Sequence, residues 1–316
     1  MKTAAAFFKG NKHVYLDEVD LPDPGADEIQ ALTYANGICM MEVWQYNGLT
    51  FDDAMIPGHE GIGVVYKAGK NVATVKEGDL ITASGWKWSK YQNIKAENVI
   101  KITKKPDDID SFLVEPASCV VNACAHVEFY PGDRVIVFGA GYMGLLLAMA
   151  LKYQPISKLT IVDIKQFNLD LAKKLTNADE FINLSEEGGR KRLEEYGSGA
   201  FEISFECSGA AEPLEWCGKL TSNGGIVGVY AWHHGKRTID GGQWHGKGHR
   251  YLNVSPSITV NERRLRSFIG AERLMSAGML PQKDLVTHKY ALSDVERAMK
   301  ESSAREGNFI KPVLIF

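Results

Sequence analysis

The sequence is poor in cysteine, with five in 316 residues, and their number is odd and their spacing irregular. A disulfide framework is therefore not expected, and this cysteine content suits a reducing compartment. No run approaches the roughly 20 apolar residues that a membrane-spanning helix needs. The apolar start of the chain is interrupted at Lys9 and Lys12, too early for a secretory signal. We expect a cytoplasmic protein that does not bind a membrane.

The sequence also lacks a large excess of charge of one sign. Its formal net charge is -3, and acidic and basic residues are interspersed. A nucleic-acid partner is not expected, because such proteins usually have a basic patch. What the sequence does have is 45% hydrophobic residues, enough for a large core, and a length that favours about two domains.

The pattern of expected elements changes near residue 118. Before it, short apolar stretches separated by Pro and Gly turns predict an antiparallel, barrel-like β domain. After it, expected strands and helices alternate, which favours a parallel sheet with helices on both faces. The Gly- and His-rich stretch 241–250 is expected to be an irregular loop. We predict an α/β protein with a first domain at 1–117, completed by 264–316, and a second domain at 118–263.

A glycine-rich turn connects an expected strand, 134–138, to an expected helix, and an acidic residue, Asp163, ends the next expected strand. This order within about 30 residues indicates a dinucleotide site in which the helix N-terminus faces the pyrophosphate. Asp163 is expected to accept hydrogen bonds from the ribose and to repel a 2′-phosphate, which favours NAD over NADP. The expected cofactor contacts in the turn are Gly139, Gly141, Tyr142, Met143 and Gly144.

Three separate pieces of the first domain have side chains that bind metals: Cys39, His59 with Glu60, and Glu115. A thiolate, an imidazole and one carboxylate form a plausible zinc set with one open position for water or a substrate oxygen. Zinc would lower the pKa of a bound alcohol so that hydride can leave its carbon. Taken singly, each residue also has a structural explanation, since a lone cysteine is most often part of a core.

The order of these motifs resembles the medium-chain dehydrogenase/reductase superfamily, specifically its zinc-dependent alcohol and polyol dehydrogenases. The resemblance implies a GroES-like β-barrel catalytic domain followed by a Rossmann doubly wound parallel sheet domain. It also implies a homodimer or homotetramer, with zinc and nicotinamide meeting between the domains. The matching segments are 37–39, 57–65, Gly78-Asp79, Glu115-Pro116, 131–133, the glycine turn with Asp163, and 206–209, where Cys207 and Ser208 would lie near the cofactor.

The resemblance assigns roles to individual residues of the first domain. Cys39 and His59 would bind zinc, with either Glu60 or Glu115 as the third ligand, a choice that the sequence leaves open. Glu42 would be the carboxylate that orients His59.

Two features depart from the resemblance. Met41 stands where the family has a hydroxyl-bearing proton relay residue, and Trp44 stands where many relatives have a histidine. The alcohol proton would then leave through water, Glu60 or Tyr46. No cysteine occurs between Asp79 and Tyr91, so we expect one catalytic zinc and no structural zinc.

Aromatic and polar residues near the expected site suggest a substrate with several hydroxyl groups. Its predicted contacts are Trp44, Tyr46, Trp86 and Asn122. The predicted protein is an NAD-dependent zinc alcohol/polyol dehydrogenase that interconverts a small-molecule secondary alcohol (a polyol, cyclitol or sugar derivative) and its ketone. The alternatives are a metal-free NAD(P)H reductase of the same superfamily, mildly favoured by Met41, and a non-catalytic dinucleotide-binding protein.

Overall fold

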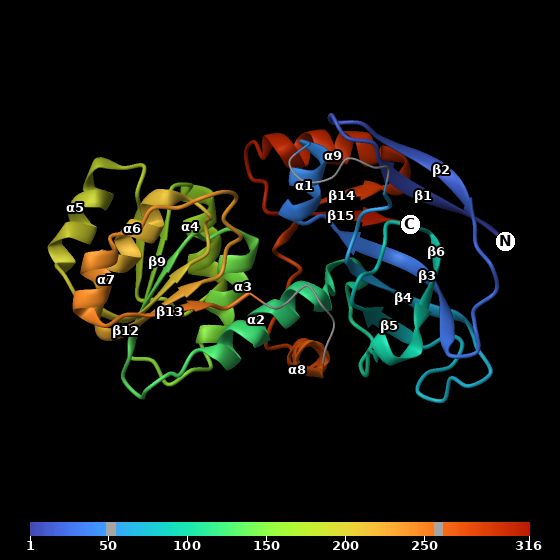
Figure 1. The fold of residues 1–316 in the computed structure, drawn as a ribbon, viewed down its shortest axis with the longest axis horizontal. Coiled ribbons are helices and arrows are strands. Elements are labelled where there is room, and N and C mark those ends of the chain that lie inside the picture. Colours follow the sequence, from blue (N-terminus) through green and yellow to red (C-terminus); the bar gives the residue numbers. More distant parts are fainter. Residues whose placement is uncertain (49–54, 256–261) are drawn as a thin grey trace. The chain divides into compact units, whose positions relative to one another are not determined.

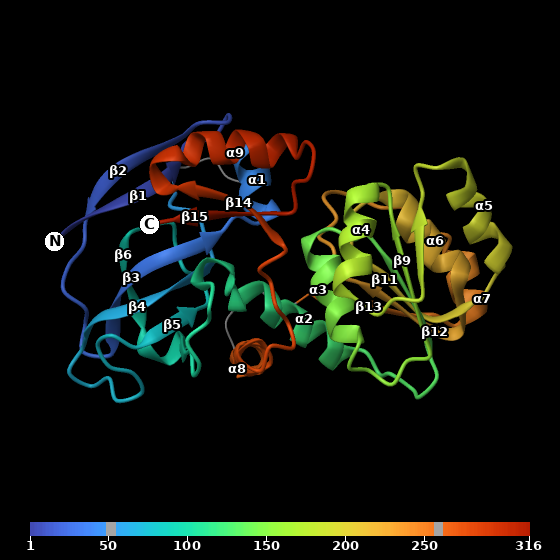
Figure 2. The same ribbon diagram turned by 180° about the vertical axis from the view of Figure 1, so that it is seen from behind.

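The computed structural model describes residues 1–48, 55–255 and 262–316. The chain divides into two compact units, Met1–Ser118 with Thr259–Phe316, and Cys119–Ile258 (Figures 1 and 2). One unit is built on largely antiparallel strands and the other on a parallel sheet, so the predicted α/β class is confirmed. In the part of the chain that the structure describes, no helix is long and apolar enough to cross a membrane.

The first unit contains a two-stranded and a seven-stranded sheet. In the larger one the strand order is β14-β15-β3-β4-β5-β7, with β6 paired to β3; all pairs are antiparallel except β14 with β15. The C-terminal strand β15 therefore lies beside β3 from the start of the chain. The strands are β1 (Lys2–Phe8), β2 (Val14–Asp20), β3 (Glu28–Gly37), β4 (Glu60–Ala68), β5 (Leu80–Ala83), β6 (Tyr91–Lys95), β7 (Val99–Lys101), β14 (Val286–Ala291) and β15 (Lys311–Ile315).

Among the described residues, two apolar clusters contribute to the core of this unit, because inward-facing residues of neighbouring strands pack together. One includes Ile29, Ile81 and Trp86; the other joins Phe8 to Val43. The helices are α1 (Met40–Tyr46), α8 (Glu262–Ser276) and α9 (Val295–Ala304), with short 3-10 turns at Ala96–Asn98, Ile109–Ser111 and Leu292–Asp294; α2 (Val114–His126) begins in this unit and continues into the second.

The second unit is a six-stranded parallel sheet of order β10-β9-β8-β11-β12-β13. The chain runs outward from β8 to β10 and then returns to β11 on the other side of β8, so the strand order reverses there. Ligands of open α/β sheets bind at the carboxyl ends of the strands at this point. The elements are β8 (Arg134–Phe138), α3 (Tyr142–Leu151), β9 (Lys158–Asp163), α4 (Gln166–Leu175), β10 (Glu180–Asn183), α5 (Glu187–Tyr196), β11 (Phe201–Glu206), α6 (Ala211–Leu220), β12 (Thr221–Val229), α7 (Gly241–Lys247) and β13 (Arg250–Asn253).

The stretch 241–250 is not the irregular loop expected from its composition. It forms helix α7 and the start of β13. The side chain of Asp240 caps the helix by accepting a hydrogen bond from the backbone N–H of Gln243, and Trp244 is buried in the core of the unit. The cap and the buried indole together stabilise a helix that its glycines disfavour.

Candidate metal and dinucleotide sites

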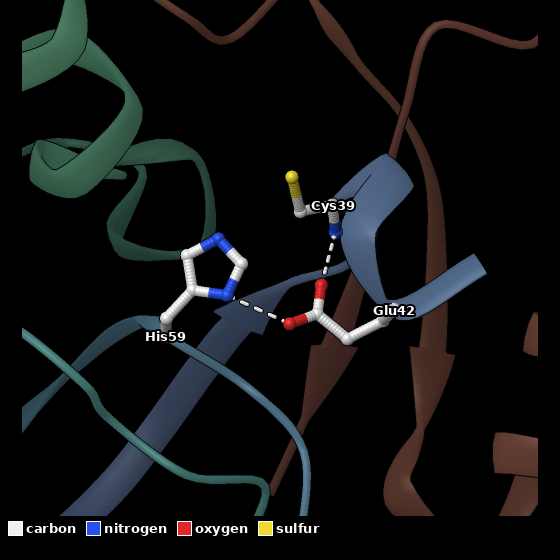
Figure 3. Close-up of side chains that lie close together, drawn as sticks. All are labelled: Cys39, Glu42 and His59. Carbon is white, nitrogen blue, oxygen red and sulfur yellow. Dashed lines mark hydrogen bonds and ion pairs between the residues drawn. The ribbon is translucent and has the colours of Figure 1, made fainter. Parts of the chain in front are cut away.

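Helix α1 brings Cys39 and Glu42 together with His59 (Figure 3). Cys39 is the N-cap residue, and its backbone N–H donates a hydrogen bond of 2.8 Å to Oε2 of Glu42. The other carboxylate oxygen, Oε1, lies 2.7 Å from Nδ1 of His59. One buried carboxylate thus fixes both residues, and the contact between Glu42 and His59 predicted from the sequence is present. With Nδ1 engaged, Nε2 is the ring nitrogen that can bind a metal.

Glycine at position 58 lets the chain present His59 at the start of β4. Its φ is +107°, in the region that favours glycine. A Cβ at this position would lie 2.4 Å from Cδ1 of Trp88 and 2.8 Å from its backbone nitrogen. A larger residue would therefore displace the turn that holds His59.

Glu60 lies between His59 and a buried lysine. Its Oε1 is 3.9 Å from Nε2 of His59, and its Oε2 forms a close ion pair with Nζ of Lys311. Lys311 also donates a hydrogen bond of 3.1 Å to the carbonyl of Ile38. Gly37 is the β3 partner of Glu60, and a Cβ there would lie 2.0 Å from Oε2 of Glu60. The glycine therefore makes room for the ion pair.

Glu115, in the first turn of α2, forms a buried ion pair with Arg264 in the first turn of α8. One carboxylate oxygen of Glu115 also belongs to a group with His59 and Glu60 whose ligand atoms all lie within 4.8 Å of one another. Cys39, Glu42 and His59 form a second such group. The structure therefore brings the predicted residues into two groups that share His59.

The surroundings shift the pKa values of these groups. Burial raises the pKa of the Cys39 thiol. Burial opposes protonation of His59, but the charge of Glu42 and hydrogen bonds to Cys39 and Glu42 raise its pKa well above the usual value. The pKa of Glu42 is lowered because His59 and the N–H of Cys39 outweigh the effect of burial. Burial raises the pKa of Glu60, and Lys311 opposes this rise.

The glycine-rich turn follows β8 as predicted, and α3 begins at Tyr142 with Gly141 as its N-cap. Gly139 has a φ of +100°, and a Cβ there would lie 2.9 Å from the backbone nitrogen of Ser208. A Cβ at Gly144 would lie 1.8 Å from the carbonyl oxygen of Gly139. These two glycines therefore permit close packing of strand, turn and helix. Met143 lies in the same first turn of α3.

Asp163 ends β9 and contacts the glycine turn. Its Oδ2 accepts a hydrogen bond of 2.6 Å from the N–H of Ala140, and its Oδ1 accepts one of 2.8 Å from the N–H of Lys165. A carboxylate has about four acceptor positions. Asp163 can therefore hold the turn and still accept hydrogen bonds from a ribose.

Sequence reasoning missed a second buried carboxylate at the carboxyl end of the sheet. Oε1 of Glu206 accepts hydrogen bonds from the N–H groups of Ser208 (2.7 Å) and Gly209 (2.9 Å), and Oε2 lies 2.6 Å from Nε2 of His233. This network fixes the loop with Cys207 and Ser208 beside the glycine turn. The sequence pattern that could have revealed it is an acidic residue, Glu206, at the end of an apolar strand.

The predicted substrate contacts do not share one environment. Trp86 is fully buried in a core cluster, and its indole N–H donates a hydrogen bond to a buried hydroxyl. Tyr46 is buried in the other cluster of the same unit. Both are core positions, and the assignment of these two side chains as substrate contacts stays a prediction. Asn122 is also buried and donates to the carbonyl of Val254 at 2.9 Å; Trp44 is half-buried on α1.

Comparisons with known proteins agree with this fold. The family model of the alcohol dehydrogenase GroES-like domain matches residues 25–103. D-arabinitol dehydrogenase 1 of Uromyces fabae is 23% identical, over 96% of this chain and 94% of its own length. Sorbitol dehydrogenase of Arabidopsis thaliana is 24% identical, over 97% and 93%. The structure of an alcohol dehydrogenase from Escherichia coli CFT073 with NADH has a TM-score of 0.87 at 19% identity and covers 100% of this chain and 99% of that one.

Proposed function

We propose that the chain is a member of the medium-chain dehydrogenase/reductase superfamily and that it is a zinc- and NAD-dependent dehydrogenase, which interconverts a secondary alcohol and its ketone. The match to the alcohol dehydrogenase GroES-like domain and the relatives that align along most of the chain support the family. The observation that supports this most is the arrangement of Cys39, His59 and Glu60, with Glu42 holding the first two. His59 lies in both groups of possible ligands, one with Cys39 and one with Glu60, and a thiol, an imidazole and a carboxylate are the ligand types of a catalytic zinc site.

The residues fit a zinc ion in number, type and burial. Cys39, His59 and Glu60 would hold it, because Oε1 of Glu60 is the carboxylate oxygen that faces Nε2 of His59 at 3.9 Å. Three protein ligands leave the open position of a catalytic site. When bound, zinc lowers the pKa of the substrate hydroxyl group and favours hydride transfer to the nicotinamide.

The other residues of the site position the ligands and move protons. The carboxylate of Glu42 engages Nδ1 of His59, which leaves Nε2 as the ring nitrogen that can bind a metal. Met41 cannot pass on a proton. Tyr46 is a poor carrier because burial raises its pKa. The alcohol proton therefore leaves through water or Glu60.

The cofactor would bind on the turn 139–144. The backbone N–H groups at the start of α3 would face the pyrophosphate, and Asp163 would accept hydrogen bonds from the adenosine ribose. The negative charge of Asp163 opposes a 2′-phosphate, so NAD is the proposed cofactor.

The proposed substrate is a polyol, cyclitol or sugar-derived alcohol. Relatives named for D-arabinitol and sorbitol support this class. We also propose that the active form is a homodimer or homotetramer in the cytoplasm. A metal-free reductase of the same superfamily would have no use for a half-buried cysteine and histidine fixed by one buried carboxylate.

A substrate panel tests the activity. Zinc-loaded protein is incubated with NAD and a set of polyols, cyclitols, aliphatic alcohols and benzylic alcohols, and NADH is followed by absorbance. Turnover of polyols or cyclitols is expected. Turnover of simple alcohols alone would overturn the substrate class, and NAD(P)H-dependent reduction of alkenes or quinones alone would overturn the dehydrogenase.

A further inference from the structure

The loop 207–209 follows β11 and lies against the glycine-rich turn. The backbone N–H of Cys207 donates a hydrogen bond of 2.8 Å to the carbonyl of Phe138, the last residue of β8. A Cβ at Gly139 would lie 2.9 Å from the backbone nitrogen of Ser208, so the loop and the turn are in direct contact. β8 and β11 are neighbours where the strand order reverses, and ligands bind at the carboxyl ends of such strands. The loop is therefore part of the proposed cofactor site.

The strand order indicates which half of a dinucleotide this loop would face. Asp163 ends β9 on one side of β8, whereas the loop follows β11 on the other side. In the proposed binding mode, the adenosine ribose lies at Asp163 and the pyrophosphate lies on the turn 139–144. The nicotinamide half would then extend away from β9, across the carboxyl end of β11.

A chain of three side chains supports the loop from the segment that follows β12. Oε1 of Glu206 accepts hydrogen bonds from the N–H groups of Ser208 and Gly209. Its Oε2 lies 2.6 Å from Nε2 of His233, and Nε of Arg237 donates a hydrogen bond of 3.1 Å to Nδ1 of the same ring. Because an arginine can only donate, Nδ1 is an acceptor. The proton of the neutral ring is then on Nε2, which donates it to Glu206.

Arg237 also connects the two segments directly. Its Nη2 donates a hydrogen bond of 3.1 Å to the carbonyl of Gly209, and its Nη1 donates one of 2.9 Å to the carbonyl of His234. The planar guanidinium has five donors, so one side chain can hold the histidine ring, the loop and its own segment together. Glu206 is fully buried and His233 is one-tenth exposed, whereas Arg237 lies at the surface. Arg237 can therefore be replaced while Glu206 keeps its histidine partner.

We propose that Arg237 is a positioning residue that acts through His233 and Glu206 to hold the loop 207–209 in the conformation that binds the nicotinamide half of the cofactor. The proposal rests on the proposed dinucleotide site. A loop that is already ordered lowers the cost of binding, because less conformational freedom is lost when the cofactor arrives. ADP, which has only the adenosine and the two phosphates, needs the glycine turn and Asp163. NADH needs the ordered loop as well.

Binding of these two ligands tests the proposal without reference to turnover. The dissociation constant of NADH is measured by fluorescence, and that of ADP by isothermal titration calorimetry, for the wild type and for Arg237→Met. We expect NADH affinity to fall about 10-fold and ADP affinity to change less than ~2-fold, because the lost hydrogen bonds order only the loop. Equal NADH affinities in the two folded proteins would overturn the proposal, as would an equal loss for both ligands.

Lys236→Met is the matched control for charge. Lys236 is an exposed cation next to Arg237 in the same segment, and only its backbone carbonyl accepts from Arg237, at 3.2 Å. The substitution removes one positive charge and keeps the hydrogen bonds of Arg237. We expect both ligands to bind as they do to the wild type. A loss of NADH affinity as large as in Arg237→Met would mean that the segment merely attracts an anion, and would overturn the positioning role.

Glu206→Gln tests whether the three side chains act as one chain. The amide group of the glutamine would present a donor to Nε2 of His233, so the ring would carry its proton on Nδ1 and could not accept from Arg237. We expect Glu206→Gln to weaken NADH binding and the addition of Arg237→Met to cost little more. Near-ultraviolet circular dichroism establishes that each variant is folded. Losses that multiply in the folded double variant would contradict the coupling.

The wild-type protein separates this proposal from the proposed function. If it binds neither NADH nor ADP, the dinucleotide site itself is refuted, and the role of Arg237 with it. If it binds both ligands and Arg237→Met binds them equally well, only the role of Arg237 is refuted.

Discussion

At the scale of single residues, the candidate metal site is held together by buried carboxylates, each of which forms a hydrogen bond or an ion pair with a neighbouring side chain. Cys39 and His59 could be predicted because each lies in a short local motif. Arg264 could not, since its pairing with Glu115 joins residues 149 positions apart and no local pattern marks it. Lys311 is a similar case, as only the return of β15 to β3 brings it to Glu60. Such long-range pairs depend on the folded chain, and the sequence around either residue does not indicate them.

The contacts of Glu42 give the first prediction. Glu42→Gln removes the charge that holds His59 and should lower zinc affinity by about 10–100-fold, the usual effect of losing a carboxylate that supports a ligand. The measurement is zinc competition with a chelator. Glu18→Gln, an exposed position in the first unit, is the control and should change nothing. Equal affinities for wild type and Glu42→Gln would refute the role of Glu42.

At the scale of elements, the barrel strands and the alternation of strands and helices were predicted from the sequence. Helix α7 was not, because its glycines hide a helix that depends on the Asp240 cap and on burial of Trp244. Helix propensity describes only the local preference of each residue, whereas the burial of the Trp244 indole depends on the other elements of the unit.

The pairing of β3 with β4 gives the second prediction. Gly37→Ala would place a Cβ 2.0 Å from Oε2 of Glu60 and 2.9 Å from Cε of Lys311. The ion pair must move, so we expect a loss of about 1–3 kcal/mol in the free energy of unfolding and weaker zinc binding. Urea denaturation measures the first effect. Gly188→Ala in α5, where a Cβ meets nothing within 4 Å, is the matched control and should be neutral or stabilising; equal behaviour of the two variants would count against the argument.

A cluster between β9, β10 and α5 gives a pH prediction. Partial burial opposes ionisation of Glu180, but hydrogen bonds from Arg192, Tyr196 and Lys158 lower its pKa to about 2. Because the folded pKa lies below the unfolded one, the stabilisation is complete above the unfolded value of about 4.5 and is lost as the pH falls towards 2. Since the cluster is partly exposed, we expect Glu180→Gln to cost about 1 kcal/mol at pH 7.

The difference in unfolding free energy between wild type and Glu180→Gln should therefore shrink between pH 5 and pH 2. Urea denaturation at several pH values measures it. Glu195→Gln, in the neighbouring helix α5 and half exposed, should show little effect at any pH. A difference for Glu180→Gln that does not change with pH would exclude the titration as its cause.

At the scale of the whole molecule, the proposed metal ligands and the glycine-rich nucleotide motif belong to different compact units. The sequence predicts two domains because its pattern changes near residue 118 from short strands to alternating strands and helices. Changes at the nucleotide end should therefore leave zinc content unaffected.

Cofactor choice tests this separation. Asp163→Asn removes the charge and keeps an acceptor for the N–H of Ala140, and Ile164→Arg adds a cation at an exposed position. The double variant should shift the ratio of NADP to NAD affinity at least ~10-fold towards NADP, about 1.4 kcal/mol, without loss of zinc. Fluorescence titration with each cofactor measures the ratio, and Ile164→Arg alone is the control. An unchanged ratio would contradict the role of Asp163.

The most direct test of the central claim is the zinc content of protein purified without added metal, measured by elemental analysis beside Cys39→Ser. We predict about one zinc per chain in the wild type, as expected for a single catalytic site, and almost none in the folded variant. A wild-type protein that contains no zinc and takes up none, or a Cys39→Ser variant that keeps it, would contradict the account.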